Sequence, residues 1–223
     1  MKKWAAIFLA LLLIFSLGFP TQATEATTEQ LQTTEYPNDI TRAPDLVAKA
    51  AIVMDVSTGR ILYEKNAYEA KYPASITKVL TTLIALEHNV NFDEVITMSD
   101  NAVWGIERDS TNIGLDVGEQ VTVRDLIYAT MVKSANECAY ALAEHVAGDL
   151  ESFANLMNAK VAELGCQNSH FVNSNGLHDD NHYTCAYDMA VITREALKSE
   201  SFREIAGTLS YTCLLYTSPS PRD

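Results

Sequence analysis

An apolar run without glycine or proline extends from Ala74 to His88, and it constrains the fold more than any other stretch of the sequence. Leucine and isoleucine continue the apolar pattern through the run, which predicts a largely buried helix. Pro73 stands just before it, where a helix does not need the backbone N–H that proline lacks. The composition agrees with a domain core, because 48% of the 223 residues are hydrophobic and 20% are charged.

The first residues are typical of an export signal. A basic start is followed by an apolar stretch over residues 5–19, and small residues stand at the −3 and −1 positions of a cleavage site after Ala23. We expect residues 1–23 to be removed as a signal peptide. Cleavage after Ala26 and retention as a membrane anchor are the alternatives. Each of them places the rest of the chain outside the cytoplasm, in the cell wall or at the outer face of the cytoplasmic membrane.

The following composition divides the chain further. Residues 24–44 are rich in Thr, Glu and Gln, which predicts a solvated linker. We expect the folded domain over residues 45–208. Residues 209–223 have no amphipathic pattern and resemble translated vector or adapter sequence. They predict a non-native tail and a domain that is incomplete at its C-terminus.

The expected domain contains both strand and helix patterns, so we predict an α+β fold. Residues 50–56 and 60–64 form two β-like runs around a Ser-Thr-Gly turn, which indicates a hairpin. Most of the chain between residues 99 and 201 is predicted to be helical. Its amphipathic runs are VTVRDLIYATMV, NECAYALAEHVAG, LESFANLMNAKVAELG and YDMAVITREALKSE, with a long polar loop before the last.

Charge and cysteine content exclude several classes of function. A formal net charge of −13 should repel nucleic acid and anionic lipid headgroups, so no nucleic-acid partner is expected. The four cysteines form no CxxC pair and have no histidine spacing suited to zinc, so no metal site is predicted. We expect free thiols, with one disulfide in an exported chain as the alternative.

Ser75 and Lys78 begin the apolar run with the spacing of one helical turn. Side chains three residues apart lie about 5–6 Å from each other at Cβ, so the lysine nitrogen can reach the serine hydroxyl. Serine is a weak nucleophile until a base removes its proton, and lysine acts as that base when burial lowers its pKa. An S-x-x-K pattern arises by chance about once in a chain of this length. A helix cap at Ser75 with an exposed Lys78 is therefore an open alternative.

A second motif decides between these interpretations, and the sequence offers two versions of it. Ser99-Asp100-Asn101 lies 24 residues after Ser75, in a context that predicts a strand end followed by a helix cap. Ser134-Ala135-Asn136 lies 59 residues after Ser75, at a break between two amphipathic helices. Such a break lets both side chains point into a shared cleft. We assign Ser134 and Asn136 to the site and treat Ser99 as a cap.

With these motifs the chain resembles the serine-type D-Ala-D-Ala carboxypeptidases, the low-molecular-mass penicillin-binding proteins of peptidase family S11. The resemblance covers about residues 48–201 in three blocks, AAIVMDVSTGRILYEKNAYEAKYPASITKVLT, IGLDVGEQVTVRDLIYATMVKSANECAYALAEHVAG and FVNSNGLHDDNHYTCAYDMA. It implies the penicillin-binding, serine β-lactamase-like fold, with an antiparallel sheet and a helical subdomain. No cofactor or metal is implied.

The resemblance also implies roles for individual residues. Ser75 would attack the penultimate D-alanine of a peptidoglycan stem peptide, Lys78 would act as general base, and Ser134 would relay a proton. Asn136, with Gly176 and Leu177 of the polar loop, would bind substrate. β-Lactams would acylate the same serine and act as covalent inhibitors. Peripheral membrane association is an expectation for a full-length member, although no amphipathic anchor is visible here.

Further loop residues fit the family less directly. Asp179 matches the family pattern and His178 occupies a variable place. Asp180, His182 and Tyr183 are candidates for shaping the cleft, but a polar loop that folds on itself explains them better than a direct catalytic role does.

The third family motif, Lys-Thr-Gly, is absent from the sequence. In the family it supplies contacts to the substrate carboxylate, so we expect this chain to lack turnover. Two alternatives remain. A class A β-lactamase would need a Glu-x-x-Leu-Asn sequence after the second motif, which the chain lacks. A non-catalytic wall-binding homologue would not need the four residues Ser75, Lys78, Ser134 and Asn136 together.

Overall fold

The apolar run forms the helix at the centre of the structure, a computed structural model that describes residues 46–107 and 109–213. Ala74–Thr77 is a single 3-10 turn, η1, and Lys78–Glu87 is the helix α2, with seven buried residues. This helix contacts four others, α5 (Asn136–Ala147), α6 (Leu150–Glu163), α7 (Ala186–Ala196) and α8 (Glu200–Ala206). The predicted buried helix is confirmed, and its first turn is tighter than an α-helix.

The chain divides into two units, residues 1–42 and residues 43–223, and all of the described structure belongs to the second. The predicted signal peptide, residues 1–23, and the linker, residues 24–44, lie outside the described residues. So do residues 214–223 of the predicted tail. None of the helices in the described ranges is long and apolar enough to cross a membrane.

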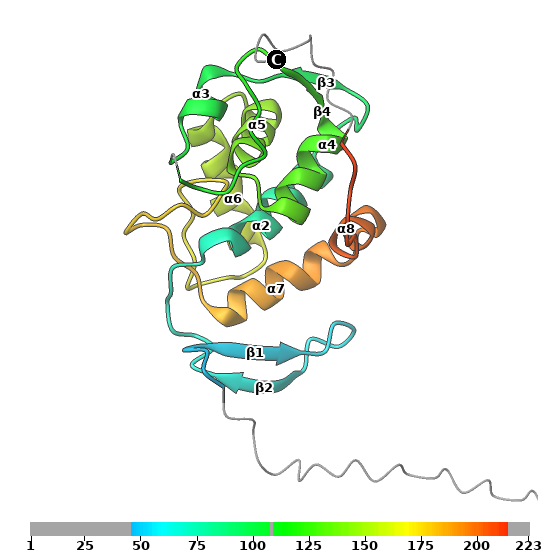
Figure 1. Ribbon diagram of the computed structural model, residues 1–223. Helices are drawn as coiled ribbons and strands as arrows, with labels where there is room; N and C mark the ends of the chain where they lie inside the picture. Colours follow the sequence, from blue (N-terminus) through cyan, green and yellow to red (C-terminus); the bar gives the residue numbers. More distant parts are fainter. Residues whose placement is uncertain (1–45, 108, 214–223) are drawn as a thin grey trace, which may run out of the picture. The chain divides into compact units, whose positions relative to one another are not determined.

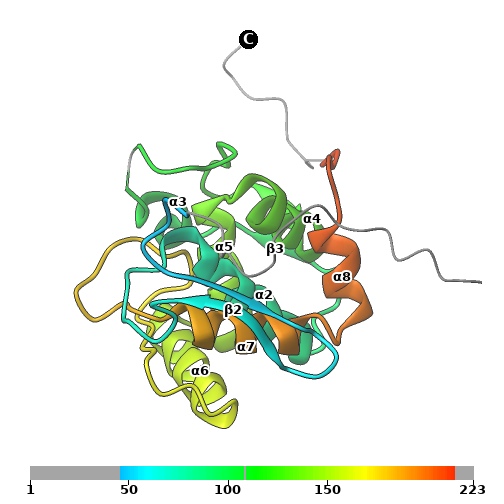
Figure 2. The same ribbon diagram turned by 90° about the horizontal axis from the view of Figure 1, so that it is seen from below.

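The predicted hairpin is present as β1 (Ala51–Met54) and β2 (Ile61–Lys65), which pair antiparallel. The Asp55 carboxylate fixes the turn by accepting hydrogen bonds from the backbone N–H and hydroxyl of Thr58 and from the Ser57 hydroxyl. The hairpin lies beside α7 and β1 contacts that helix (Figure 1, Figure 2).

A second small sheet corrects one helix prediction. β3 (Val95–Thr97) pairs antiparallel with β4 (Gln120–Thr122), so the start of the run VTVRDLIYATMV is a strand. Two β-branched residues there pair with β3, and the Thr122 side chain then caps the next helix by accepting from Asp125 N–H. The helix α4 begins only at Val123.

Four of the remaining helices follow the predicted amphipathic runs, the short helix after Ser99 follows the predicted cap, and no run was predicted for the helix Glu200–Ala206. Their packing forms two apolar clusters, and Leu86 of α2 packs against both. The helices are α3 (Asp100–Trp104), α4 (Val123–Tyr128), the π-helical turn η2 (Ala129–Lys133), α5 (Asn136–Ala147), α6 (Leu150–Glu163), α7 (Ala186–Ala196) and α8 (Glu200–Ala206).

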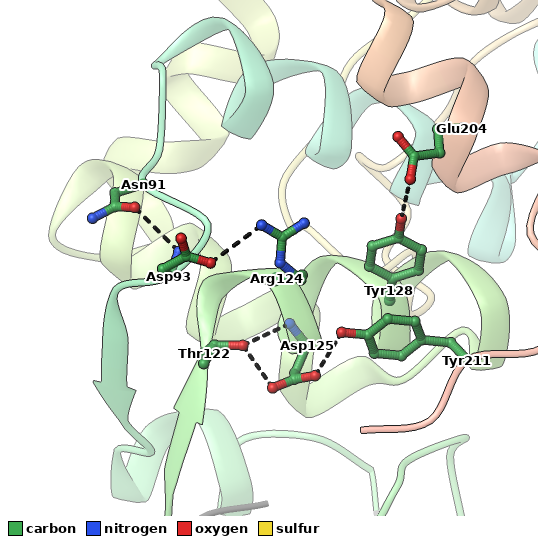
Figure 3. A network of polar contacts seen from close by, with 8 residues as sticks. All are labelled: Asn91, Asp93, Thr122, Arg124, Asp125, Tyr128, Glu204 and Tyr211. Carbon is green, nitrogen blue, oxygen red and sulfur yellow. Dashed lines mark hydrogen bonds and ion pairs between the residues drawn. The ribbon is translucent and has the colours of Figure 1, made fainter. Parts of the chain in front are cut away.

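The first residues of the predicted tail are described, and one of them packs. Leu209 is 98% exposed, whereas the Tyr211 ring stacks on Tyr128 with 4.1 Å between ring centroids. The Tyr211 hydroxyl donates to Asp125 Oδ1 at 2.8 Å, and Tyr128 donates to Glu204 (Figure 3). This segment therefore contacts α4. All four cysteines are free thiols, as predicted.

Candidate active site

The Lys78 amino group is the centre of the candidate site. Lys78 is 2% exposed, and its Nζ donates to Asn136 Oδ1 at 2.7 Å, to the backbone oxygen of Asn175 at 2.7 Å and to Ser75 Oγ at 3.3 Å. The structure thus brings together three residues that the sequence singled out, from two segments 58 residues apart. The alternative of an exposed Lys78 is wrong.

Ser75 and Lys78 meet because of the 3-10 turn in which the serine lies. Pro73 is buried, Ser75 is exposed to solvent, and the chain enters α2 at Lys78. Ser75 is therefore accessible from solvent, whereas Lys78, one turn later, is buried inside the domain.

Burial changes the acid–base properties of the lysine. Removal of the ammonium from water lowers the pKa of Lys78 from 10.5 to about 8, and the negative charge of Glu137 opposes this effect. The shift raises the neutral fraction at pH 7 roughly 300-fold, to about one tenth. A neutral amine has two N–H bonds, and Asn136 Oδ1 and Asn175 O accept both. Its lone pair is then left for the Ser75 hydroxyl.

Ser134 lies where the chain changes direction between two helices. It ends η2 with φ of 64°, and α5 begins two residues later at Asn136. Its hydroxyl oxygen is buried and has no hydrogen-bond partner among the described residues. A buried hydroxyl without a partner in the protein costs free energy, and a bound water or a catalytic role are two explanations for it.

Ser99 is a helix cap, as predicted. Its hydroxyl accepts from the backbone N–H of Ala102 in the first turn of α3 and donates to Glu144 Oε2. Asn101 Nδ2 donates to the other oxygen of the same carboxylate. The literal Ser-Asp-Asn sequence therefore fastens α3 to α5.

Gly176 packs directly behind the turn that carries Ser75. Its φ is +88°, and a Cβ atom there would lie 1.9 Å from the backbone oxygen of Ala74. Only glycine allows this approach. Leu177 follows, partly buried, with its N–H donating to Asn175 Oδ1. Gly176 thus contacts the turn that carries Ser75, whereas the hydrogen bond of Leu177 lies within the loop.

The other candidate residues of the loop differ in how deeply they are buried. Asp180 and Tyr183 are exposed, and Tyr72 donates to Asp180 Oδ1 at 3.3 Å. His182 is 1% exposed and contacts Thr77 within the nucleophile turn. Among the described residues, no group of three His, Cys, Asp or Glu side chains is placed to hold a metal ion.

Sequence reasoning missed the role of Asn175. Its contribution is a backbone oxygen, which no side-chain motif marks, although the following Gly176 is a signal for close backbone approach. Ser174 extends the same contact, because its backbone oxygen accepts from Thr81 at 2.6 Å.

A family model for D-alanyl-D-alanine carboxypeptidase, peptidase family S11, matches residues 38–216. The chain belongs to this family. A D-alanyl-D-alanine carboxypeptidase of Bacillus subtilis (strain 168), DacF, is 36% identical over 165 residues, which are 72% of this chain and 42% of the relative.

Solved structures agree with the family. Penicillin-binding protein 5 from Haemophilus influenzae superposes with a TM-score of 0.70 at 32% identity, covering 74% of this chain and 49% of that one. The Streptomyces K15 DD-transpeptidase gives a TM-score of 0.70 at 30% identity, covering 74% and 66%. The predicted penicillin-binding fold is confirmed. This S11 chain spans about two fifths of the length of the curated relatives it matches.

Proposed function

We propose that this chain carries the reacting groups of a serine D-Ala-D-Ala carboxypeptidase, in which Ser75 forms the acyl-enzyme and Lys78 is the general base. Because the sequence lacks the Lys-Thr-Gly motif, we expect acylation but no turnover by the chain itself. The observation that carries the proposal is the position of the Lys78 amino group, 3.3 Å from Ser75 Oγ and fixed by two oxygen acceptors. A base that is buried, oriented and lowered in pKa is what a serine nucleophile requires.

In a protein that also supplies the third family motif, the reaction has two steps. Ser75 Oγ attacks the carbonyl carbon of the penultimate D-alanine while Lys78 takes the hydroxyl proton. The bond to the terminal D-alanine breaks, and the proton passes through Ser134 to the leaving amine nitrogen. Water next hydrolyses the ester and restores the Ser75 hydroxyl. Backbone N–H groups at the start of η1 and α2 favour the negative charge that develops on the carbonyl oxygen.

Substrate and location follow from the same proposal. The substrate is the stem peptide of peptidoglycan, with Asn136, Gly176 and Leu177 at the binding surface, and β-lactams acylate Ser75 as covalent inhibitors. Peptidoglycan lies outside the cytoplasm, so the protein is exported by the signal peptide proposed for residues 1–23. Peripheral attachment of a full-length protein to the membrane is part of this proposal.

Intact-mass measurement after incubation with benzylpenicillin tests the nucleophile. We expect one adduct on the chain and none on Ser75→Ala. An adduct that survives in Ser75→Ala would contradict the assignment of Ser75, and absence of an adduct from the unchanged chain would contradict acylation by this chain. Rapid turnover of a chromogenic cephalosporin would instead favour the β-lactamase alternative.

A further inference from the structure

His182 lies inside the domain with both ring nitrogens engaged. It is 1% exposed, and the Phe171 ring lies edge-on to it, with 5.3 Å between ring centroids. Nδ1 accepts a hydrogen bond from the backbone N–H of Val172 at 3.1 Å. Nε2 lies 2.9 Å from Thr77 Oγ1.

These two contacts determine the tautomer. Because a backbone N–H only donates, Nδ1 carries no proton, and in the neutral ring the proton is on Nε2. Nε2–H therefore donates to Thr77 Oγ1. Burial lowers the pKa of His182 to about 4, against the negative charge of Asp179 and with the help of His170. The ring is accordingly neutral at neutral pH.

Thr77 connects this histidine to the nucleophile. It is fully buried and belongs to η1, the turn that carries Ser75, and Lys78 follows it directly. The loop touches the same helix at two further points, where Asn175 O accepts from Lys78 and Ser174 O accepts from Thr81. Both of these further contacts use backbone oxygens of the loop. The His182 contact differs because it is made by a side chain and reaches the turn η1 itself.

We propose that His182 is a positioning residue, which holds Thr77 through Nε2–H and so fixes the distance and angle between Ser75 Oγ and the Lys78 amino group. The proposal rests on the function proposed above for Ser75. Its consequence is specific to the chemical step, because a displaced turn changes the proton transfer more than the noncovalent binding of a ligand. Loss of His182 should lower the maximal acylation rate with little change in the half-saturating concentration.

Two amide substitutions separate the two contacts of the ring. His182→Gln places an amide N–H near the position of Nε2 and retains a donor for Thr77. His182→Asn places an amide oxygen near the position of Nδ1 and retains an acceptor for Val172. Saturation kinetics of acylation by benzylpenicillin, followed by intact mass on the 223-residue chain, compares them. Thermal unfolding of each variant reports stability separately.

We expect His182→Asn to lower the maximal acylation rate about tenfold and His182→Gln to lower it no more than about threefold, the range of one net hydrogen bond. Thr77→Val should match His182→Asn, and the double variant should be no slower than either single one, because both remove one contact. The proposal would be overturned if His182→Asn kept the acylation rate of the unchanged chain and His182→Gln lost it. It would also be overturned if every variant unfolded at a lower temperature than the unchanged chain but acylated at the same rate.

The tautomer of His182 can be measured without any acylation of Ser75, so it tests the positioning role separately from the proposed function. If the unchanged chain gives no Ser75 adduct, the proposed function fails, and the ¹⁵N spectrum of the His182 ring decides the inference. A proton on Nε2 and none on Nδ1, together with an Nε2 signal that shifts in Thr77→Val, would support the hydrogen bond from His182 to Thr77. A proton on Nδ1 would overturn the proposal.

Discussion

At the scale of single residues, the proposed general base Lys78 gives a prediction of pH dependence. In the proposed mechanism the reactive form is the neutral amine, and the pKa of Lys78 is lowered to about 8 by burial. The acylation rate should therefore rise about tenfold per pH unit below pH 8 and level off above it. Benzylpenicillin acylation measured from pH 6 to about pH 9.5 checks this. A rate that does not change across this range would contradict Lys78 as the base.

Gly176 gives the second residue-scale prediction. Gly176→Ala introduces a Cβ atom 1.9 Å from Ala74 O, so the nucleophile turn or the loop must move. Gly118 is the matched control, because its φ is +81° but nothing lies within 4 Å of its Cβ position. We expect Gly118→Ala to cost about 1 kcal/mol in the free energy of unfolding and Gly176→Ala about 3 kcal/mol or more.

Urea unfolding and the acylation rate distinguish the two substitutions. Gly118→Ala should leave the acylation rate unchanged, and Gly176→Ala should lower it, because Gly176 lies behind the turn of Ser75. Equal losses of stability in the two variants would show that the close approach to Ala74 costs nothing beyond the positive φ.

At the scale of elements, a side-chain cap decides where β4 ends and α4 begins. Thr122 Oγ1 accepts from Asp125 N–H and donates to Asp125 Oδ2. Thr122→Ala should lower the free energy of unfolding by about 1 kcal/mol, whereas Thr122→Ser retains the hydroxyl and should cost less than half of that. Chemical denaturation of both variants measures the difference. Equal stability of the alanine and serine variants would contradict the capping role.

Local pattern predicted most of these elements and failed where tertiary pairing competes with it. The helix of residues 74–88 and the hairpin follow from apolar periodicity and turn residues, which are local properties. The strand β4 was missed because its residues continue the apolar pattern of α4, and only pairing with β3 makes them a strand. The 3-10 turn at Ser75 was missed because its geometry depends on the loop at Gly176, about 100 residues later.

At the scale of the whole molecule, the candidate site also contains residues that local sequence predicted and residues that depend on tertiary contacts. Spacing and resemblance singled out Ser75, Lys78 and Asn136, and the structure brings their side chains together. The Asn175 oxygen and the Thr77–His182 contact depend on folding of the loop against α2, across 97 and 105 residues of sequence, so no local pattern marks them. The sequence therefore predicted side chains that meet in the structure, and it missed the backbone oxygen and the loop side chain that contact them from far along the chain.

The segment around Tyr211 gives the last prediction, also at the scale of the molecule. The sequence predicts a non-native tail from residue 209, yet Tyr211 stacks on Tyr128 and donates to Asp125 (Figure 3). If this packing stabilises the domain, Tyr211→Phe should cost about 1 kcal/mol for the hydrogen bond, and Tyr211→Ala about 2–4 kcal/mol because the ring contact is lost too. Leu209→Ala is the control, since that side chain is 98% exposed. Urea unfolding orders the three variants, and a Tyr211→Ala variant as stable as Leu209→Ala would show that the tail adds nothing to the domain.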